Sequence, residues 1–205
     1  MAKIGITFKE TMAGPFMLGI QEPEAGAVAG KEAGQSLAMH AAVTIDDLDG
    51  FVADPQHLGG LAGTIDFAPL GRAIPASRGV FNLFSPTDDP AMRHMVYELS
   101  FTQAGTTYYL AGHKRVRNDP GFDLWRDTTT LFTTLHEGQD KSAPVVGAGV
   151  LSLGLDELMK LIASLRVTGT DDAIDKTAAI TKFGRFFMGE LWERYAPRGI
   201  RSRGR

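Results

Sequence analysis

Residues 37–45 read Leu-Ala-Met-His-Ala-Ala-Val-Thr-Ile, and this stretch decides the class of fold. Large apolar side chains mostly alternate along it with small or polar ones, and in a strand every second residue points the same way. This two-residue period is typical of a strand with one face in a core. The same rhythm returns at 94–101, where Met95, Tyr97, Leu99 and Phe101 share one side. A short link containing Gly105 then leads to 107–112, which predicts a hairpin.

The rest of the first 155 residues extends this pattern. Further strands are predicted at 4–8, 15–20, 61–67, 79–84, 127–136 and 145–153, about nine in total. Lys9 and Glu10 interrupt the first apolar stretch. The links at 21–34, 50–60, 68–78 and 85–91 are rich in Gly, Pro and Asp, and long helical crossovers are missing. The sequence therefore predicts a mainly β fold, an antiparallel β-sandwich or β-barrel.

The last quarter changes its period to that of helices. Two helices are predicted at about 156–166 and 171–196, and Pro197 ends the second. We expect residues 1–196 to form one β-rich domain. Residues 197–205 contain four arginines and no acidic residue, which predicts a basic, flexible tail.

The composition excludes several classes of protein. The net charge of −3 argues against a nucleic-acid binder, which would be strongly basic. The absence of cysteine excludes disulfides, thiolate metal sites and cysteine nucleophiles, and favours the cytoplasm. The sequence has neither the apolar run of a signal peptide nor one long enough to span a membrane. Nothing in the sequence indicates the oligomeric state.

The sequence also lacks the usual catalytic motifs. The Gly-x-Ser-x-Gly elbow is absent, and Gly147, Gly149 and Gly154 do not have the spacing of a dinucleotide-binding loop. The five histidines are dispersed, although His94 and His113 flank one predicted hairpin and could meet. We therefore expect no catalytic residue, no resident metal and no cofactor. The acidic cluster formed by Asp46, Asp47 and Asp49 does not fit the EF-hand template, and calcium binding between loops stays open.

A series of motifs in chain order resembles a known family. The motifs are Phe8-x-Glu10-Thr11-Met12-x-Gly14, Tyr97-x-Leu99-x-Phe101, Tyr109-Leu110-x-Gly112-x-Lys114, Trp125-x-Asp127-Thr128-Thr129-Thr130-Leu131 and Phe183-x-x-Phe186-Phe187-x-Gly189-x-Leu191-Trp192-x-x-Tyr195. Together they resemble the accessory, non-flavin region of large cholesterol-oxidase-like GMC oxidoreductases. The flavin fingerprint and the catalytic histidine region of those oxidases have no counterpart here. The resemblance thus implies a free-standing accessory domain, with the matched residues in structural roles.

We expect a non-catalytic binding or regulatory module that holds an apolar small molecule, such as a lipid or sterol, or docks on an oxidoreductase partner. The expected apolar cavity lies between a curved sheet and the last helix. Its predicted lining residues are Met95, Tyr97, Phe101, Phe132, Phe183 and Phe187. Two alternatives stay open. One is a hydrolase or isomerase with a site built from loops. The other is a peripheral membrane or partner surface formed by Arg185, Phe186, Arg198 and Arg201.

Overall fold

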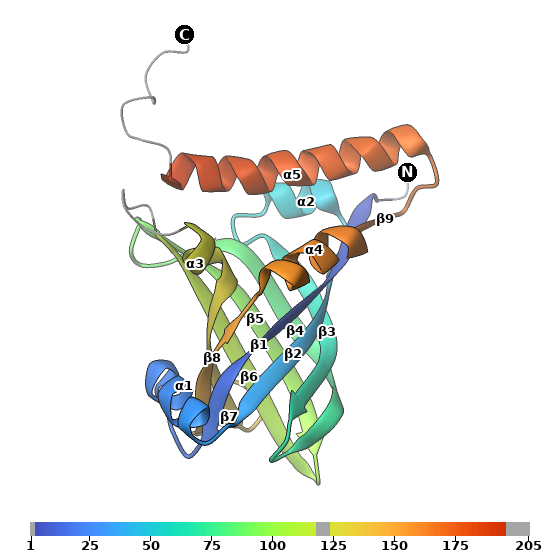
Figure 1. Ribbon diagram of the computed structural model, residues 1–205. Helices are drawn as coiled ribbons and strands as arrows, with labels where there is room; N and C mark the ends of the chain where they lie inside the picture. Colours follow the sequence, from blue (N-terminus) through green and yellow to red (C-terminus); the bar gives the residue numbers. More distant parts are fainter. Residues whose placement is uncertain (1–2, 118–123, 196–205) are drawn as a thin grey trace.

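The computed structural model describes residues 3–117 and 124–195, and a closed antiparallel β-barrel forms its centre (Figure 1). Eight strands follow one another around the barrel in chain order, and β1 pairs with both β2 and β8 to close it. The strands are β1 (Gly5–Leu18), β2 (Ser36–Ile45), β3 (Leu58–Phe67), β4 (Gly71–Pro86), β5 (Met92–Gln103), β6 (Thr106–Arg117), β7 (Thr130–Glu137) and β8 (Val145–Ser152). A ninth short strand, β9 (Arg166–Thr168), pairs with the start of β1.

Alternate residues of each strand fill the barrel. Large apolar side chains, among them Phe16, Phe67 and Phe81, are almost completely buried there. A barrel of eight strands is just wide enough to be filled by side chains or to hold one small ligand. The interior is therefore the place where inward-facing residues from distant parts of the sequence meet.

The pairing of strands around the barrel is interrupted along β1. β8 pairs with β1 from Ala13 onward, and β9 pairs with it only from Gly5 to Thr7. Between these two ladders, no described strand pairs with this side of residues 8–12. Helix α4 (Leu155–Ser164) covers the gap, and Ser164 Oγ accepts a hydrogen bond of 2.8 Å from the Lys9 amide. A side-chain hydroxyl thus satisfies a strand amide that has no strand partner.

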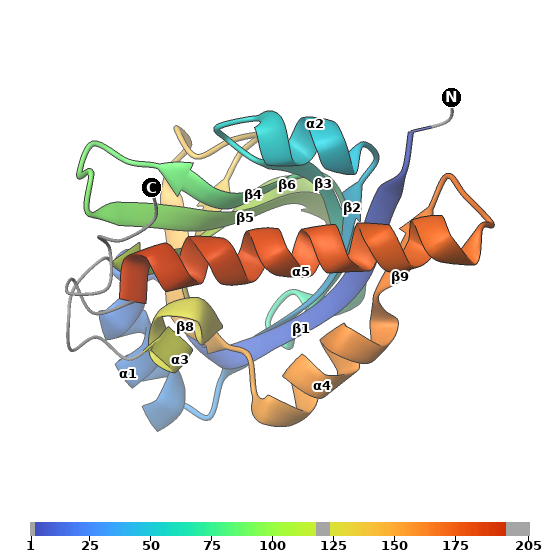
Figure 2. The same cartoon turned by 90° about the horizontal axis from the view of Figure 1, so that it is seen from above.

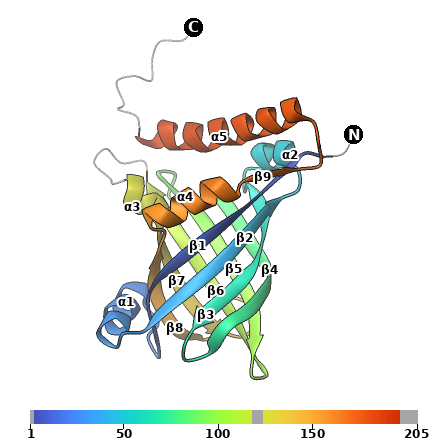
Figure 3. The same cartoon turned by 45° about the vertical axis from the view of Figure 1, so that its right-hand side comes forward.

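The helices cover the ends and the outside of the barrel. Helix α5 (Ala173–Tyr195) runs across one open end, as the view from above shows (Figure 2). Helices α2 (Leu48–Ala53), α3 (Leu124–Thr129) and α4 lie around the rim of that end. Helix α1 (Pro23–Glu32) packs outside β1 and β8, near the opposite end (Figure 3). One end of the interior is therefore closed by α5.

The predicted fold class is confirmed, because the chain is mainly β and antiparallel. Of the two architectures expected, sandwich and barrel, the structure has the barrel. The two predicted C-terminal helices are α4 and α5. The predicted strands 4–8 and 15–20 are one continuous strand, β1, because Lys9 and Glu10 keep the alternation without a break. Strand β9 and helices α1, α2 and α3 were not predicted. The predicted tail, 197–205, lies outside the described residues.

Candidate functional site

Three ionisable side chains meet inside the otherwise apolar barrel. They are Glu10 on β1, Tyr97 on β5 and Lys114 on β6, and we call them the interior cluster. Each occupies an inward position in its strand, between apolar neighbours that are also buried. Their exposed fractions are only 3%, 3% and 2%. The barrel therefore holds a buried ion pair with a phenol beside it.

The members of the interior cluster are joined by short hydrogen bonds. Lys114 Nζ donates to Glu10 Oε1 over 2.8 Å, and the Tyr97 hydroxyl donates to Glu10 Oε2 over 2.8 Å. Lys114 Nζ also lies 3.3 Å from the Tyr97 hydroxyl oxygen. Burial raises the pKa of Tyr97 well above its usual value, and the neighbouring Glu10 carboxylate adds to this. The phenol therefore stays protonated and acts as a hydrogen-bond donor.

The hydrogen-bonding capacity of the interior cluster is not exhausted. An ammonium group has three N–H donors, and Lys114 directs two of them to Glu10 and Tyr97. The ammonium also lies over the face of the Tyr97 ring, 4.7 Å from its centroid, and within the part of the chain that the structure describes no other oxygen or nitrogen accepts a hydrogen bond from Nζ. A buried donor without an acceptor costs about 1–3 kcal/mol, more when it is charged. The interior cluster can thus donate one further hydrogen bond, from Lys114 Nζ, to a polar atom of a bound molecule.

Small residues flank the interior cluster on the neighbouring strands. The cross-strand row that begins at Glu10 continues through Ala41, Gly63 and Ala76. The row that begins at Tyr97 continues through Gly112, Thr133 and Gly149. Each row ends at a phenylalanine, because Ala76 pairs with Phe101 and Gly149 pairs with Phe16. Neighbouring side chains fill the space over two of these glycines: a Cβ atom on Gly112 would meet Leu131, and one on Gly149 would meet Phe16.

The structure places five of the six predicted cavity residues in the barrel interior or on the helix that covers its end. Met95, Tyr97 and Phe101 face the barrel interior and are almost fully buried. Phe183 and Phe187 reach down from α5, where they pack on Phe8 and Phe84, with ring centroids 6.1 and 5.6 Å apart respectively.

Phe132 does not line the interior, and its prediction as a cavity residue is wrong. Its side chain points outward, where its ring lies 6.0 Å from that of His113 and 4.2 Å from the Arg115 guanidinium carbon. Leu131 and Leu135 set the inward phase of β7 and leave Phe132 on the outside.

The predicted partner or membrane surface is only partly described. Phe186 is partly buried, and its ring packs against Phe51, His57 and Phe84. It thus helps to hold α5 on the barrel end. Arg185 lies on the outer side of α5, beside a surface hollow of about 700 Å³. Arg198 and Arg201 fall outside the described residues.

A second group of polar residues lies on the outside of the wall, over β5, β6 and β7. It surrounds a pocket of about 300 Å³ lined by His94, Glu98, His113, Thr134, His136 and Lys141, with Val96, Ala111 and Gly112. The rings of His94 and His113 lie 4.8 Å apart, as their places on one hairpin suggested. Glu98 accepts hydrogen bonds from Tyr109 over 2.5 Å and from Lys141 over 2.9 Å. The carboxylate in this pocket is thus already satisfied.

Two of the three histidines of this outer pocket, His94 and His113, favour the neutral form. Burial lowers the pKa of His113 to about 4, and the nearby His94 and Arg115 add to this while Glu24 opposes it. Burial, with Arg115, also lowers the pKa of His94. Arg115 Nε donates to His113 Nε2 over 3.2 Å, a contact that needs an unprotonated ring nitrogen.

We expect the outer pocket to make the fold sensitive to acid. Between pH 6.5 and about 4 an unfolded chain protonates His113 and the folded chain does not, so stability falls as the pH is lowered through this window. In H113Q this loss should shrink by about 1 kcal/mol, allowing for solvent screening at a partly exposed ring. Urea unfolding at pH 7 and pH 4.5 measures the difference. An unchanged pH dependence in H113Q would contradict the assignment.

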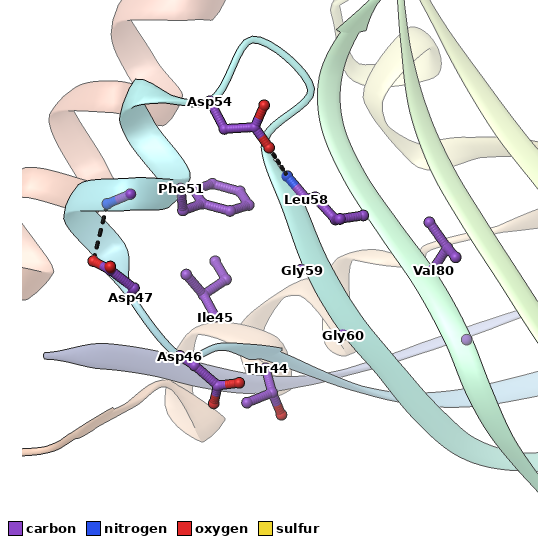
Figure 4. Close-up of a pocket in the computed structure, with 12 residues that line it drawn as sticks. Thr44, Ile45, Asp46, Asp47, Phe51, Asp54, Leu58, Gly59, Gly60 and Val80 are labelled. Atoms are coloured by element: carbon purple, nitrogen blue, oxygen red, sulfur yellow. Dashed lines mark hydrogen bonds between the residues drawn. The ribbon is translucent and has the colours of Figure 1, made fainter. Parts of the chain in front are cut away.

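A third pocket, of about 540 Å³, lies beside α2 and the adjoining ends of β2 and β3 (Figure 4). Two of its three acidic residues, Asp47 and Asp54, are engaged in local structure. Asp47 accepts from the Gly50 amide over 2.9 Å and pairs with Lys3 over 2.8 Å, and Asp54 accepts from the Leu58 amide. Outside the pocket, Asp49 pairs with Lys182 of α5.

These contacts bear on the calcium site left open at Asp46, Asp47 and Asp49. In the described residues no group of three histidine, cysteine, aspartate or glutamate side chains is arranged to hold a metal ion.

Sequence reasoning misses two of the three members of the interior cluster. It treats Glu10 as a break between strands, and Lys114 only as part of a motif. The signal that could have found them is the phase of the alternation. Lys114 shares the inward phase of Leu110, Gly112 and Val116, and Glu10 that of Phe8 and Met12. A charged residue on the core side of a strand signals a buried partner, because burying an unpaired charge costs a large amount of free energy.

The motifs of the resemblance contribute to the interior cluster. Glu10, Tyr97 and Lys114 each come from a different motif of the series.

None of the helices in the described ranges has the length and hydropathy needed to cross a membrane. A scan against protein-family models, a search of curated proteins and a search of solved structures each found no match.

Proposed function

We propose that the barrel binds one small, mostly apolar molecule whose single neutral polar group accepts a hydrogen bond from Lys114. The observation that carries this proposal is the interior cluster, a buried ion pair and phenol with one ammonium N–H that no oxygen or nitrogen of the described residues accepts. A buried ion pair is weak evidence for stability, since apolar residues of similar volume often serve as well or better. Its presence inside the barrel favours a role in recognition.

The charge of the interior cluster selects the kind of polar group. Glu10 and Lys114 together carry no net charge, and Tyr97 stays protonated. A ligand carboxylate would add an unpaired negative charge at a site with almost no solvent contact, which is costly. A hydroxyl or carbonyl adds none and still accepts the free N–H. We therefore propose alcohols and carbonyl compounds, sterols and lipids of these kinds included, over fatty acids.

The surroundings supply the apolar part of the site. Met95, Leu99 and Phe101 lie on the same inward face of β5 as Tyr97, and each is almost fully buried. Phe183 and Phe187 of α5 cover the barrel end above them. Apolar walls with few polar groups are the usual composition of small-molecule sites.

The proposal predicts a clear order of affinities in two matched series of probes, one built on naphthalene and one on a dodecyl chain. In each series the substituent is a methyl ketone, a hydroxyl, a carboxylate or hydrogen. We expect the ketone and the alcohol to bind about ten-fold more tightly than the carboxylate and the unsubstituted compound. Titration monitored by native mass spectrometry and by the thermal shift of the protein measures the order.

Variants separate recognition from stability in this test. E10Q/K114M keeps the cluster uncharged and should bind all four members of each series with equal, weak affinity. K141M removes a lysine that is 69% exposed and should bind like the unchanged protein. Equal affinity of the unchanged protein for the ketone and the unsubstituted compound, or no binding in either series, would overturn the proposal.

A further inference from the structure

We infer that Lys114 binds aldehydes or ketones covalently, as a reversible imine, with Glu10 taking the ammonium proton. This inference rests on the proposed function and goes beyond it, because it names the ligand class and a bond-forming step. Three observations carry it: an amine with almost no solvent contact, a carboxylate oxygen 2.8 Å away and a protonated phenol 3.3 Å away.

The arrangement supplies the groups that imine formation requires. Transfer of one proton from Lys114 Nζ to Glu10 Oε1 leaves a neutral amine and a neutral carboxylic acid. The amine lone pair attacks the carbonyl carbon, the electron pair of the C=O bond moves to oxygen, and the amine proton and the Glu10 proton allow that oxygen to leave as water. Aldehyde and ammonium thus give a protonated imine and one water, with no oxidant or reductant. Tyr97 donates a hydrogen bond to Glu10 and holds the carboxylate in place.

The buried charges are the same before and after this step. An ammonium and a protonated imine each carry one positive charge at the same nitrogen. The Glu10 carboxylate, regenerated when the step is complete, therefore pairs with the product as it does with the free lysine. No uncompensated charge is created inside the barrel, and this removes the main penalty for chemistry at a buried site.

Burial also distinguishes Lys114 from other lysines of the chain. Lys3, Lys141 and Lys160 are 72%, 69% and 71% exposed at their side chains, so an imine formed there is open to hydrolysis. An imine inside the barrel is shielded from bulk water. The exposed lysines serve as internal standards for any labelling experiment.

The test is reductive trapping with 2-naphthaldehyde and cyanoborohydride on the full chain, followed by peptide mapping. We expect Lys114 to be labelled about ten-fold faster than the mean exposed lysine. In E10Q the rate at Lys114 should fall about a hundred-fold, the scale of a lost general base, while labelling of exposed lysines stays the same. K141M should label at Lys114 like the unchanged protein. Near-ultraviolet circular dichroism shows whether each variant is folded.

The outcomes separate this inference from the proposed function. Tight binding of the naphthyl ketone and of 2-naphthol without trapping at Lys114 would leave the proposed function standing and overturn the inference. Trapping at Lys114 no faster than at exposed lysines would overturn it as well. If E10Q does not fold, the Y97F variant tests the same geometry: the hydroxyl that holds Glu10 is lost, so the rate at Lys114 should fall while both reacting groups remain.

Discussion

Exchanging Glu10 for glutamine destabilises the fold by about 3–5 kcal/mol, the expected cost of breaking a buried pair from one side. The Glu10 carboxylate lies 2.8 Å from Lys114 Nζ. Both side chains are buried, so water cannot take the place of a lost partner. K114M should cost a similar amount, because it leaves Glu10 buried beside an apolar group. Each single change removes one partner and keeps the desolvation penalty of the other.

The double variant E10Q/K114M should be more stable than either single variant. It removes both charges, and the new amide side chain still offers an oxygen to the Tyr97 hydroxyl, which in the unchanged protein donates to Glu10. Because the residues are in direct contact, the two changes should be strongly non-additive. Urea unfolding of the four proteins at pH 7 gives the coupling free energy. Additive losses, with the double variant as unstable as the sum of the singles, would show that no energetic pair exists.

Replacing Gly26 by valine should detach helix α1 from the barrel, with a loss of about 3 kcal/mol. A Cβ atom at position 26 would lie 2.1 Å from the Ala148 carbonyl oxygen, far inside contact distance. The same holds at Gly30, one turn later, where the nearest atom is the Phe16 amide nitrogen at 2.5 Å. Two glycines four residues apart therefore let the backbone of α1 lie directly on that of β1 and β8.

The control for this change is A25V, at an exposed position on the same helix. Surface changes of this kind stay within about 0.5 kcal/mol. Intrinsic helix propensity predicts that G26V stabilises α1, since glycine is the poorer helix former. The sign of the measured change thus decides between packing and propensity. Hydrogen exchange over residues 23–32 should accelerate in G26V only, and equal protection in both variants would refute the packing account.

The two glycines also explain why α1 was not predicted. A stretch with Gly26 and Gly30 looks like a link by propensity, because glycine disfavours helices. The helix forms because its close approach to the wall outweighs the backbone cost, and at Gly26 that approach is to Ala148, more than a hundred positions away. Tertiary contacts of this range cannot be read from local composition.

The alternation of side chains is a sound guide to the strands and a weaker guide to the site. It predicts strands, hairpin and antiparallel pairing because period and register are local properties. It fails at Phe132, where adjacent Leu131 and Phe132 offer apolar side chains to both faces. It also fails at Glu10, because a charge inside an apolar stretch resembles the end of a strand. Glu10 and Lys114 are 104 residues apart in the sequence, and only the closure of the barrel brings them into contact.

The gap in the pairing of β1 gives the barrel a place where its wall can part without loss of a strand ladder. Along most of the wall, separating neighbouring strands breaks a ladder of backbone hydrogen bonds. Beside residues 8–12 the covering helix is held instead by the Ser164 hydroxyl and by the packing of Leu158 and Leu161 on the core. A swing of α4 would therefore uncover the stretch of chain that carries Glu10 while every barrel ladder stays intact. Entry of the proposed ligand by this route would require α4 to move and would leave the barrel folded.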